Sequence, residues 1–394
     1  MMDKFESKVR ITGIGMSEVG RRLNRDPVGL AVDACLAAIR DAGLERSDID
    51  GLSSHPGPLQ LDGYTGAGVQ DVEKVLQVHP RWFNSGSEMS GHTGSVVQAM
   101  LAVAAGLARH VIVFRCTWET TAQLWEAQGM GPNRPLKIVD DYQFSVPFGA
   151  FSAANWIAMY ATRHMHRYGT TREQLGAIAI NARANAMHNP YAIYRKPLTM
   201  EDYLGARMIS TPFGLFDCDT PCDGAVAIVV SAADAARDTR RPNPLRVEAV
   251  GTQLAEKWSW DNGTLEHLPL VRGAAKMLWE RTDLKPADVD VAEIYDGFTF
   301  NALTWLELLG FCPEGEGGRF VEGGGRIARN GELPMNTHGG QLSGGRLQGF
   351  SFLHEACVQL WGEGGERQVL NDPQVAVVTS GGGAAGGAIL LSTD

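Results

Sequence analysis

The sequence predicts an α/β protein made of two similar halves. Residues 43–50 (GLERSDID) and residues 283–290 (DLKPADVD) carry nearly the same pattern of apolar and acidic positions, 240 residues apart. Each stretch follows a helical pattern and leads into an apolar run of the strand type. A strand–helix–strand unit that recurs in this way predicts a duplicated fold with parallel strands covered by helices.

The first half opens with a buried strand at Val9–Gly15 and a helix at Val28–Ala42. Asp26 is suited to cap this helix, Pro27 suits its first position, and Gly43 suits the left-handed residue that ends a helix. The matching strand and helix of the second half are Val247–Gly251 and Leu270–Arg281. A later pair of equivalent strands is Val111–Phe114 in the first half and Val375–Val378 in the second half.

A long insertion, residues 117–211, separates the strands of the first half. It holds helical patterns at residues 152–166 and 170–187, and its Trp, Met and Tyr content is equally typical of a substrate-facing cap and of a plain packing layer. The predicted organisation is an N-terminal half at 1–116 and 212–241, the insertion at 117–211, and a C-terminal half at 242–394.

The composition narrows the class of protein. The chain has 394 residues, of which 44% are hydrophobic, and a formal net charge of −10. The apolar fraction is enough for a large core, and the acidic balance argues against general binding of nucleic acids or membrane surfaces. The first ten residues are charged, and no apolar run is long enough to span a bilayer, so we expect a cytoplasmic protein.

The cysteines indicate free thiols rather than a metal site. Six are scattered along the chain, and Cys218 and Cys222 are spaced C-x3-C without a second pair. Reduced thiols are the usual state in the cytoplasm, and zinc sites use paired motifs. No phosphate-binding glycine motif follows a strand near the N-terminus. We therefore predict neither a metal nor a redox cofactor.

Several stretches, in the expected order along nearly the whole chain, resemble the thiolase superfamily and its sterol-carrier-protein branch. They are VRITGIG at 9–15, NPY at 189–191, RKP at 195–197, RMI at 207–209, DCD at 217–219 and CDGA at 222–225. The resemblance implies the thiolase fold, in which two βαβαβαββ halves pack as a five-layer αβαβα sandwich. The helix after Gly94 and the helix around Leu353–Trp361 are then the expected central pair.

Each of the four thiolase active-site motifs is altered in this chain. The segment 87–94 (SEMSGHTG) stands where the resemblance places the nucleophilic cysteine, and no cysteine occurs between Cys35 and Cys116. YDGF at 295–298 replaces Asn-Glu-Ala-Phe, GRL at 345–347 replaces Gly-His-Pro, and TSG at 379–381 replaces Cys-x-Gly. Thiolase chemistry needs a thiolate and a second cysteine that moves a proton, so a working thiolase is not predicted.

The thioester site of the family is still expected here. The resemblance places Ser380, Gly381 and Gly382, with Gly383, at a turn whose backbone N–H groups stabilise an enolate oxygen. Ser90 and His92 form either a nucleophile with its base or, as the sequence favours, a helix cap that lines the pocket. His338 is a further pocket candidate, although a histidine beside glycine is more often structural.

Three residues are the candidates for the chemistry. Tyr295 is the candidate for proton transfer, the alternative being a core tyrosine. In the thiolases that this chain resembles, the residue at the position of Arg346 shares a pocket with the motif at the position of Tyr295. Arg346 therefore either assists Tyr295 as a cation, binds the enolate, or forms a salt bridge with a local carboxylate. Asp296 either caps a turn or serves as a base.

The YDGF motif resembles the thiolase-like lipid-transfer group that includes steroid side-chain aldolases. This resemblance implies retro-aldol cleavage of a β-hydroxyacyl-CoA, with a steroid side chain as one acyl group to consider, to a carbonyl compound and a shorter acyl-CoA. Coenzyme A is then part of the substrate, and no cofactor is expected. The alternatives are a non-catalytic acyl-CoA- or lipid-binding subunit and an acyltransferase with a nucleophile other than cysteine.

The same resemblance implies partners. We expect a homodimer built on an edge strand at Val111–Phe114, which binds two small zinc-ribbon and OB-fold proteins in a heterotetramer. The side-chain aldolases are similar to this chain except near Arg346, where they place a second tyrosine.

Overall fold

In the part of the chain that the structure describes, nine strands form one continuous mixed sheet that consists of two half-sheets. The computed structural model describes residues 4–55, 67–85, 94–130, 142–150, 152–254, 269–382 and 385–393. The strand order is β3-β2-β4-β7-β1-β8-β11-β10-β9, and the half-sheets meet where β1 and β8 pair over two residues. These strands are β1 (Val9–Met16), β2 (Gly51–Ser54), β3 (Trp82–Ser85), β4 (His110–Trp118), β7 (Asp223–Ala232), β8 (Leu245–Leu254), β9 (Val291–Glu293), β10 (Val375–Ser380) and β11 (Ala385–Ser392).

The two half-sheets have the same pairing pattern, which confirms the predicted duplication. In the first half, β7 lies antiparallel between β1 and β4, and β2 is parallel to β4. In the second half, β11 lies antiparallel between β8 and β10, and β9 is parallel to β10.

The fifth strand differs between the halves. In the first half β3 pairs in parallel with β2 over four residues. Among the described residues of the second half, only an isolated parallel bridge joins Ala292 of β9 to Met335. Pro334 has no N–H to extend a ladder, and Asn336 has a φ of 52°, which turns the chain away. The predicted five-stranded sheet is therefore correct for the first half, whereas the described residues of the second half form four strands and a bridge.

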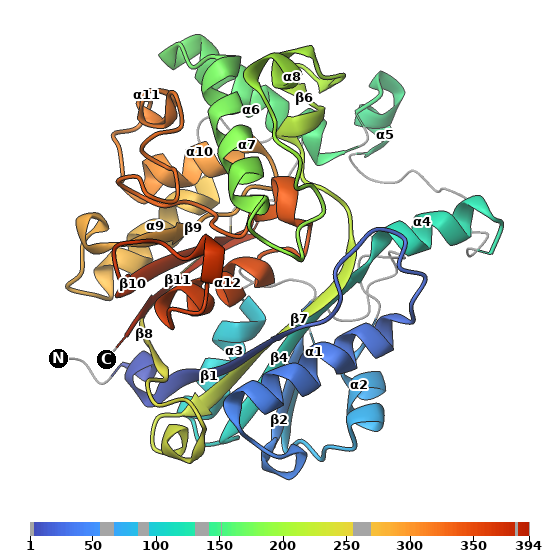
Figure 1. The fold of residues 1–394 in the computed structure, drawn as a ribbon, viewed down its shortest axis with the longest axis vertical. Helices are drawn as coiled ribbons and strands as arrows, with labels where there is room; N and C mark the ends of the chain where they lie inside the picture. The colour runs from blue at the N-terminus through green and yellow to red at the C-terminus, as the bar shows by residue number, and fades with distance from the viewer. Residues whose placement is uncertain are drawn as a thin grey trace.

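Helices cover the outer faces of both half-sheets and fill the space between them (Figure 1). On the first half, α1 (Pro27–Ala42) and α2 (Val69–Leu76) form one core with the outer strand faces. On the second half, α9 (Pro269–Glu280) and α10 (Thr299–Leu308) do the same. Between them, α3 (Gly94–Ala104) and α12 (Phe350–Leu360) share one core with both half-sheets. This is the predicted five-layer arrangement with the predicted central helices.

Alternate residues of the interior strands point to different layers. In β4, Val111 and Val113 join the core around α3, whereas Ile112 and Phe114 face α1 and α2. All four side chains are fully buried. A strand that is covered on both faces has a continuous apolar sequence, which is why this one was recognisable.

The repeated sequences form the same turn in both halves. Asp48 and Asp288 each accept a hydrogen bond from the backbone N–H three residues earlier, at 2.8 and 2.7 Å. Asp50 accepts from the two backbone N–H groups at the start of β4, at 2.8 and 2.9 Å, and Asp290 does so at the start of β10, at 2.8 and 3.0 Å. Each turn is therefore tied to the next parallel strand.

The cap residues of α1 act as predicted. The Asp26 carboxylate accepts from the N–H groups of Val28 and Gly29, at 2.8 and 3.2 Å. Gly43 ends the helix with a φ of 69°.

The insertion forms a mainly helical layer next to the second half (Figure 1). Its two long helices, α6 (Ala153–Tyr168) and α7 (Arg172–Ala186), confirm the predicted helical patterns. Helix α7 packs against α10 and against a turn called η7 (Gly340–Gly344). The shorter elements of the insertion and its surroundings are α4 (Glu119–Ala127), α5 (Tyr142–Ser145), α8 (Met200–Gly205), β5 (Met208–Ser210), β6 (Phe213–Gly214) and α11 (Gly317–Val321).

The prediction that Val111–Phe114 is the edge strand is wrong. Val111–Phe114 lies inside β4, which is hydrogen-bonded to β2 on one side and to β7 on the other. The outermost strand of the first half-sheet is β3, whose Phe83 is 68% exposed. An apolar run that is buried on both faces is typical of an interior strand. The position of this strand after the helix does not indicate an edge.

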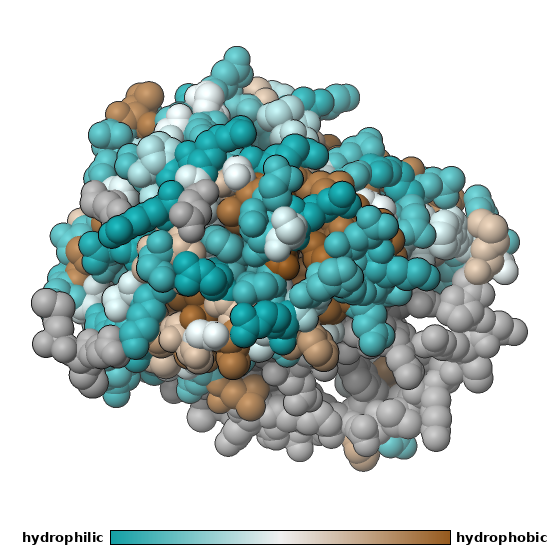
Figure 2. Space-filling model, turned by 90° about the horizontal axis from the view of Figure 1, so that it is seen from below, coloured by the Kyte–Doolittle hydropathy of each residue, from teal (hydrophilic) through white to brown (hydrophobic). Residues whose placement is uncertain are grey.

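The face of the molecule shown in Figure 2 is largely hydrophilic where it is coloured. Seen from below, hydrophobic residues appear as small patches among hydrophilic ones (Figure 2). None of the described helices has the length and apolar character needed to cross a membrane.

Candidate active site

The candidate site lies where two neighbouring parallel strands, β9 and β10, end. Tyr295 follows β9 after one residue, and Ser380 is the last residue of β10. The backbone N–H of Tyr295 donates a hydrogen bond to Oγ1 of Thr379 at 2.8 Å. Ligands of α/β proteins bind at the carboxyl ends of parallel strands. The structure therefore brings together two of the altered motifs, YDGF and TSG.

Two glycines make room for the Tyr295 side chain. A Cβ on Gly297 would lie 2.8 Å from the tyrosine hydroxyl oxygen, and a Cβ on Gly382 would lie 3.3 Å from Cε1 of its ring. Neither glycine has a positive φ, so each is required for space and not for its backbone conformation. The ring stands edge-on to Phe352 of α12, with centroids 6.4 Å apart. The half-buried tyrosine thus lies against glycine backbone.

Asp296 is fully buried and accepts hydrogen bonds at both oxygens. Oδ1 accepts from the backbone N–H of Gln341 at 2.7 Å, and Oδ2 accepts from Nδ2 of Asn336 at 3.0 Å. A Cβ on Gly340 would lie 1.9 Å from Oδ2. Burial raises the pKa of Asp296 to about 7, although these hydrogen bonds work against the shift. Asp296 therefore caps the turn η7 (Gly340–Gly344), and capping a turn is one of its two predicted roles.

His338 is buried beside Glu293, the last residue of β9. Its Nδ1 lies 2.9 Å from Oε2 of Glu293, and its Nε2 has no hydrogen-bond partner among the described residues. Burial disfavours the imidazolium, but nearby carboxylates, Glu293 foremost, outweigh it and raise the pKa of His338. The ring stands edge-on to Phe352, with centroids 5.1 Å apart. His338 and Tyr295 thus contact the same phenylalanine.

Arg346 is held by two carboxylates. Its Nη1 donates to Oδ1 of Asp219 at 2.8 Å, its Nε donates to Oε2 of Glu119 at 3.2 Å, and its Nη2 donates to the other oxygen of Glu119. Burial raises the pKa of Asp219 to about 6, although the guanidinium of Arg346 works against the shift. Of the predicted roles, the structure shows the salt bridge. The negative charges of Glu119 and Asp219 offset the positive charge of Arg346, so an enolate beside Arg346 would meet little net positive charge.

The turn after β10 is anchored by α10. Nε1 of Trp305 donates to the carbonyl oxygen of Gly381 at 3.0 Å, and Gly381 has a φ of 84°. Ser380 is fully buried. Ser90, His92 and Gly383 lie outside the described residues, so the roles predicted for them stay predictions.

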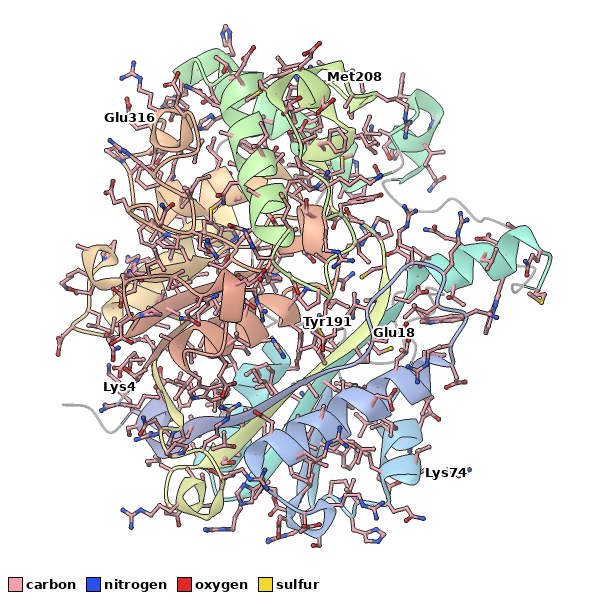
Figure 3. The ribbon with its side chains drawn as sticks, in the orientation of Figure 1. Lys4, Glu18, Lys74, Tyr191, Met208 and Glu316 are labelled. Carbon is pink, nitrogen blue, oxygen red and sulfur yellow. The ribbon has the colours of Figure 1, made fainter. Side chains whose placement is uncertain are left out.

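A loop of the insertion passes beside the site. The backbone N–H groups of Ile193 and Tyr194 donate to carbonyl oxygens of η7, at 3.2 and 3.0 Å. The Tyr194 hydroxyl accepts from Nη1 of Arg21, in the first half, at 3.0 Å. Tyr191 of the same loop lies at mid-height in Figure 3, between the insertion helices and the first half. The insertion therefore contributes to the region around the turn that leads to Arg346.

None of the six thiols is set up as a nucleophile. No disulfide joins them. Burial raises the pKa of all six thiols. The pKa rises to about 12 for Cys116, Cys218, Cys222 and Cys312, and it is also raised for Cys35 and Cys357. The thiolate is the reactive form, so these cysteines are unreactive near neutral pH. This includes Cys222, whose Sγ lies 3.0 Å from where a Cβ on Gly345 would be.

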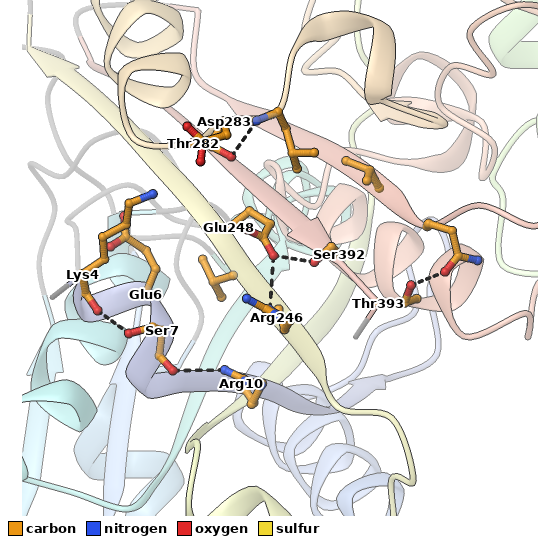
Figure 4. Close-up of a pocket in the computed structure, with 14 residues that line it drawn as sticks. Lys4, Glu6, Ser7, Arg10, Arg246, Glu248, Thr282, Asp283, Ser392 and Thr393 are labelled. Carbon is orange, nitrogen blue, oxygen red and sulfur yellow. Dashed lines mark hydrogen bonds and ion pairs between the residues drawn. The ribbon is translucent and has the colours of Figure 1, made fainter. Parts of the chain in front are cut away.

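Two hollows contain none of the predicted site residues. One, of about 920 Å³, is lined by the N-terminal turn η1 (Phe5–Lys8), β8 and the end of β11 (Figure 4). Its polar groups pair with one another, since Glu248 accepts from Ser392 at 2.7 Å and lies 3.3 Å from Nε of Arg246. The other, of about 490 Å³, is an apolar hollow at α5 and α6. In the part of the chain that the structure describes, no group of His, Cys, Asp and Glu is arranged to hold a metal ion.

Sequence reasoning missed four residues near the site. Glu119 and Asp219 pair with Arg346 from 227 and 127 residues away, and no sequence signal marks such distant partners. Glu293 is an acidic residue at the end of an apolar strand, and Asn301 is an amide among mostly apolar residues of its helix. Both of these exceptions are visible in the sequence.

Comparisons with known proteins agree with the geometry. Residues 262–391 match the family described as thiolase C-terminal domain-like. The chain is 34% identical over 397 residues to 17-hydroxy-3-oxo-4-pregnene-20-carboxyl-CoA lyase of Mycobacterium tuberculosis, covering 96% of this chain and 99% of the relative. It is 34% identical over 365 residues to the steroid side-chain-cleaving aldolase of Thermomonospora curvata, covering 90% of each.

Solved structures give the same result. The Ltp2-ChsH2(DUF35) aldolase matches with a TM-score of 0.86 and 32% identity, over 98% of both chains. Human mitochondrial 3-ketoacyl-CoA thiolase, at 13% identity, shares the fold with a TM-score of 0.71 over 99% of this chain and 100% of that one. The chain therefore belongs to the thiolase superfamily, in the sterol-carrier-protein-like branch that includes the steroid side-chain aldolases.

Proposed function

We propose that this protein is an aldolase of thiolase fold that cleaves a β-hydroxyacyl-CoA into a carbonyl compound and a shorter acyl-CoA. Its near-full-length relatives are a lyase and an aldolase, and they confirm the predicted reaction class, a carbon–carbon lyase. The name of the Mycobacterium tuberculosis relative describes a hydroxylated steroid CoA ester. A steroid side chain is therefore the acyl group that we propose.

The observation that carries this proposal is Tyr295, which lies beside the turn of Ser380, Gly381 and Gly382 in a site without a thiolate. Tyr295 and Gly382 lie together at the ends of β9 and β10, where a thioester enolate can be held. The six cysteines are buried thiols with raised pKa values, so acyl transfer through cysteine is disfavoured. A retro-aldol reaction needs an acid–base group and an enolate site, and no covalent intermediate.

In the proposed reaction, Tyr295 as its anion accepts the proton of the β-hydroxyl group while the Cα–Cβ bond breaks. The β-carbon becomes a carbonyl carbon, and the electron pair of the broken bond forms the thioester enolate. Backbone N–H groups near Ser380, Gly381 and Gly382 stabilise the enolate oxygen. Return of the proton to Cα completes the shorter acyl-CoA, so that no other reactant is consumed.

The test is turnover of a steroid CoA ester with a β-hydroxyl group, compared with a short-chain 3-hydroxyacyl-CoA. Liquid chromatography with mass spectrometry should detect the ketone and the shorter acyl-CoA in equal amounts, and the intact protein mass should not change. An acyl adduct on the protein would instead support the acyltransferase. Tight binding without cleavage, with the partner present, would support the non-catalytic subunit.

We further propose a homodimer and a partner protein. The edge strand β3 is the surface proposed for pairing of two copies, in place of β4. The Ltp2-ChsH2(DUF35) aldolase carries two components in its name, and a zinc-ribbon and OB-fold protein is the partner that we propose for this chain. The cytoplasm remains the proposed location. Light scattering should give two copies for the isolated chain, and Phe83→Pro in β3 should shift it toward the monomer.

A further inference from the structure

Asn301 is a buried amide without a hydrogen-bond partner among the residues that the structure describes. It lies in the first turn of α10, is 1% exposed, and within the described part of the chain neither its Oδ1 nor its Nδ2 is paired. Polar side chains nearby on the same helix are paired: the Thr299 hydroxyl donates to Asp217 at 2.6 Å, and the Trp305 indole donates to Gly381 at 3.0 Å. A buried polar group without a partner destabilises the folded state. The folded protein carries this cost at Asn301.

The unpaired amide lies at the turn that holds the candidate enolate site. A Cβ on Gly382 would lie 2.5 Å from Nδ2 of Asn301 and 3.3 Å from Cε1 of Tyr295. The φ of Gly382 is not positive, so the glycine keeps this place clear without being needed for the backbone angle. Trp305, one helical turn further along α10, binds the neighbouring Gly381 and fixes the helix against the turn. Asn301, Tyr295 and Gly382 thus lie together.

We propose that Asn301 is a further catalytic residue, whose Nδ2–H donates a hydrogen bond to the thioester oxygen of the bound acyl-CoA and stabilises the enolate oxygen that forms there. The inference rests on the proposed retro-aldol function. In that reaction the electron pair of the broken Cα–Cβ bond comes to this oxygen. A donor that is already fixed in place gains most where negative charge develops, so it lowers the barrier more than it strengthens binding.

Asn301→Leu tests this role, because leucine has a similar shape and no hydrogen-bonding atoms. Removing an unpaired amide should leave the free energy of unfolding unchanged or higher. Removing a donor to the enolate should lower kcat by about 10²–10³-fold, with a smaller change in KM. The matched control is Asn185→Leu, since Nδ2 of Asn185 donates to the carbonyl oxygens of Met335 and Asn336, at 2.9 and 3.1 Å, and its loss should lower stability. Asn301 is structural, and the proposal is overturned, if both variants lose stability equally or if Asn301→Leu keeps the wild-type kcat.

A binding measurement separates this inference from the proposed function. The wild type should bind an acyl-CoA more tightly than its thioether analogue, which lacks the carbonyl oxygen. Asn301→Leu should lower this preference by about 3- to 10-fold, the share of one hydrogen bond, and the backbone N–H groups near Ser380, Gly381 and Gly382 account for the preference that remains. An unchanged preference in the variant contradicts the role of Asn301. Absence of cleavage by the wild type overturns the aldolase instead, and the binding preference still decides whether Asn301 contacts the thioester oxygen.

Discussion

The backbone N–H of Tyr295 is hydrogen-bonded to Oγ1 of Thr379, so a residue at the end of β10 positions the tyrosine that follows β9. Thr379→Val removes the acceptor and leaves the N–H buried, which should lower the free energy of unfolding by about 1–3 kcal/mol. Displacement of the tyrosine should lower kcat by about tenfold. Urea denaturation and steady-state kinetics measure both effects. Thr379→Ser keeps the hydroxyl and should restore kcat; if it does not, the hydrogen bond is not what positions Tyr295.

Tyr295→Phe keeps the ring that packs on Phe352 and removes only the hydroxyl. A general acid–base group contributes about 10²–10⁴-fold, so kcat should fall by that factor. The thermal midpoint and the affinity for acyl-CoA should stay close to the wild-type values. Turnover at the wild-type rate would make the tyrosine structural, and the base would then be Asp296 or a group from the partner.

Arg346→Met should destabilise the protein strongly. It leaves the partly buried Glu119 and Asp219 without their shared cation, and since breaking a fully buried ion pair costs about 3–5 kcal/mol, the loss should approach that range from below. The side chains of Arg346, Glu119 and Asp219 are 16%, 13% and 11% exposed. The matched control is Lys276→Met, which removes the exposed pair between Lys276 and Glu280 and should cost at most about 0.5 kcal/mol. Equal losses in the two variants would contradict a buried role for Arg346.

The ionisation of Asp296 should lower stability as the pH rises from about 4 to about 7, while His55 and His354, whose pKa values burial lowers to about 3 and about 4, contribute in the opposite direction. The pKa of Asp296 is raised by burial to about 7, above the ordinary value of about 4, so this carboxyl group keeps its proton in the folded protein and loses it in the unfolded chain within this window. Asp219, with its pKa raised to about 6, adds to the same slope, and the raised pKa of His338 extends the loss to higher pH. Urea denaturation at several pH values measures the slope.

Asp296→Asn should reduce that slope. The amide does not titrate, so the contribution of Asp296 to the pH dependence disappears, whatever the change in absolute stability. A variant with the full wild-type slope would show that Asp296 does not titrate in this window.

The duplicated core was predictable because its signals are local. Asp26, Pro27 and Gly43 identify the first helix, and the motifs that end at Asp50 and Asp290 identify the turn that both halves share. In the described part of the second half, the replacement of a fifth strand by an isolated bridge at Met335 was not predictable from the apolar pattern alone. It depends on Pro334 and on the left-handed Asn336, whose side chain donates to Asp296.

The candidate site was predictable only in part. The motifs located Tyr295 and the turn at Ser380, and the structure places these segments side by side. They could not reveal that Glu119 and Asp219 hold Arg346, because those contacts join residues that are far apart in sequence. The position of Val111–Phe114 after a helix does not make it an edge strand, because its continuous apolar sequence is buried on both faces inside the sheet.

The two ends of the nine-stranded sheet are unlike. Within the described residues, β3 has a pairing partner on one side only, whereas β9 is bridged by Met335 and leads into the turn that Asp296 holds. A strand from another chain can extend the sheet at β3, but at β9 it would displace that turn. Growth by strand addition is therefore restricted to one end. A dimer through β3, the assembly proposed for this chain, would use up the accessible edge, so it would close and not propagate into a filament.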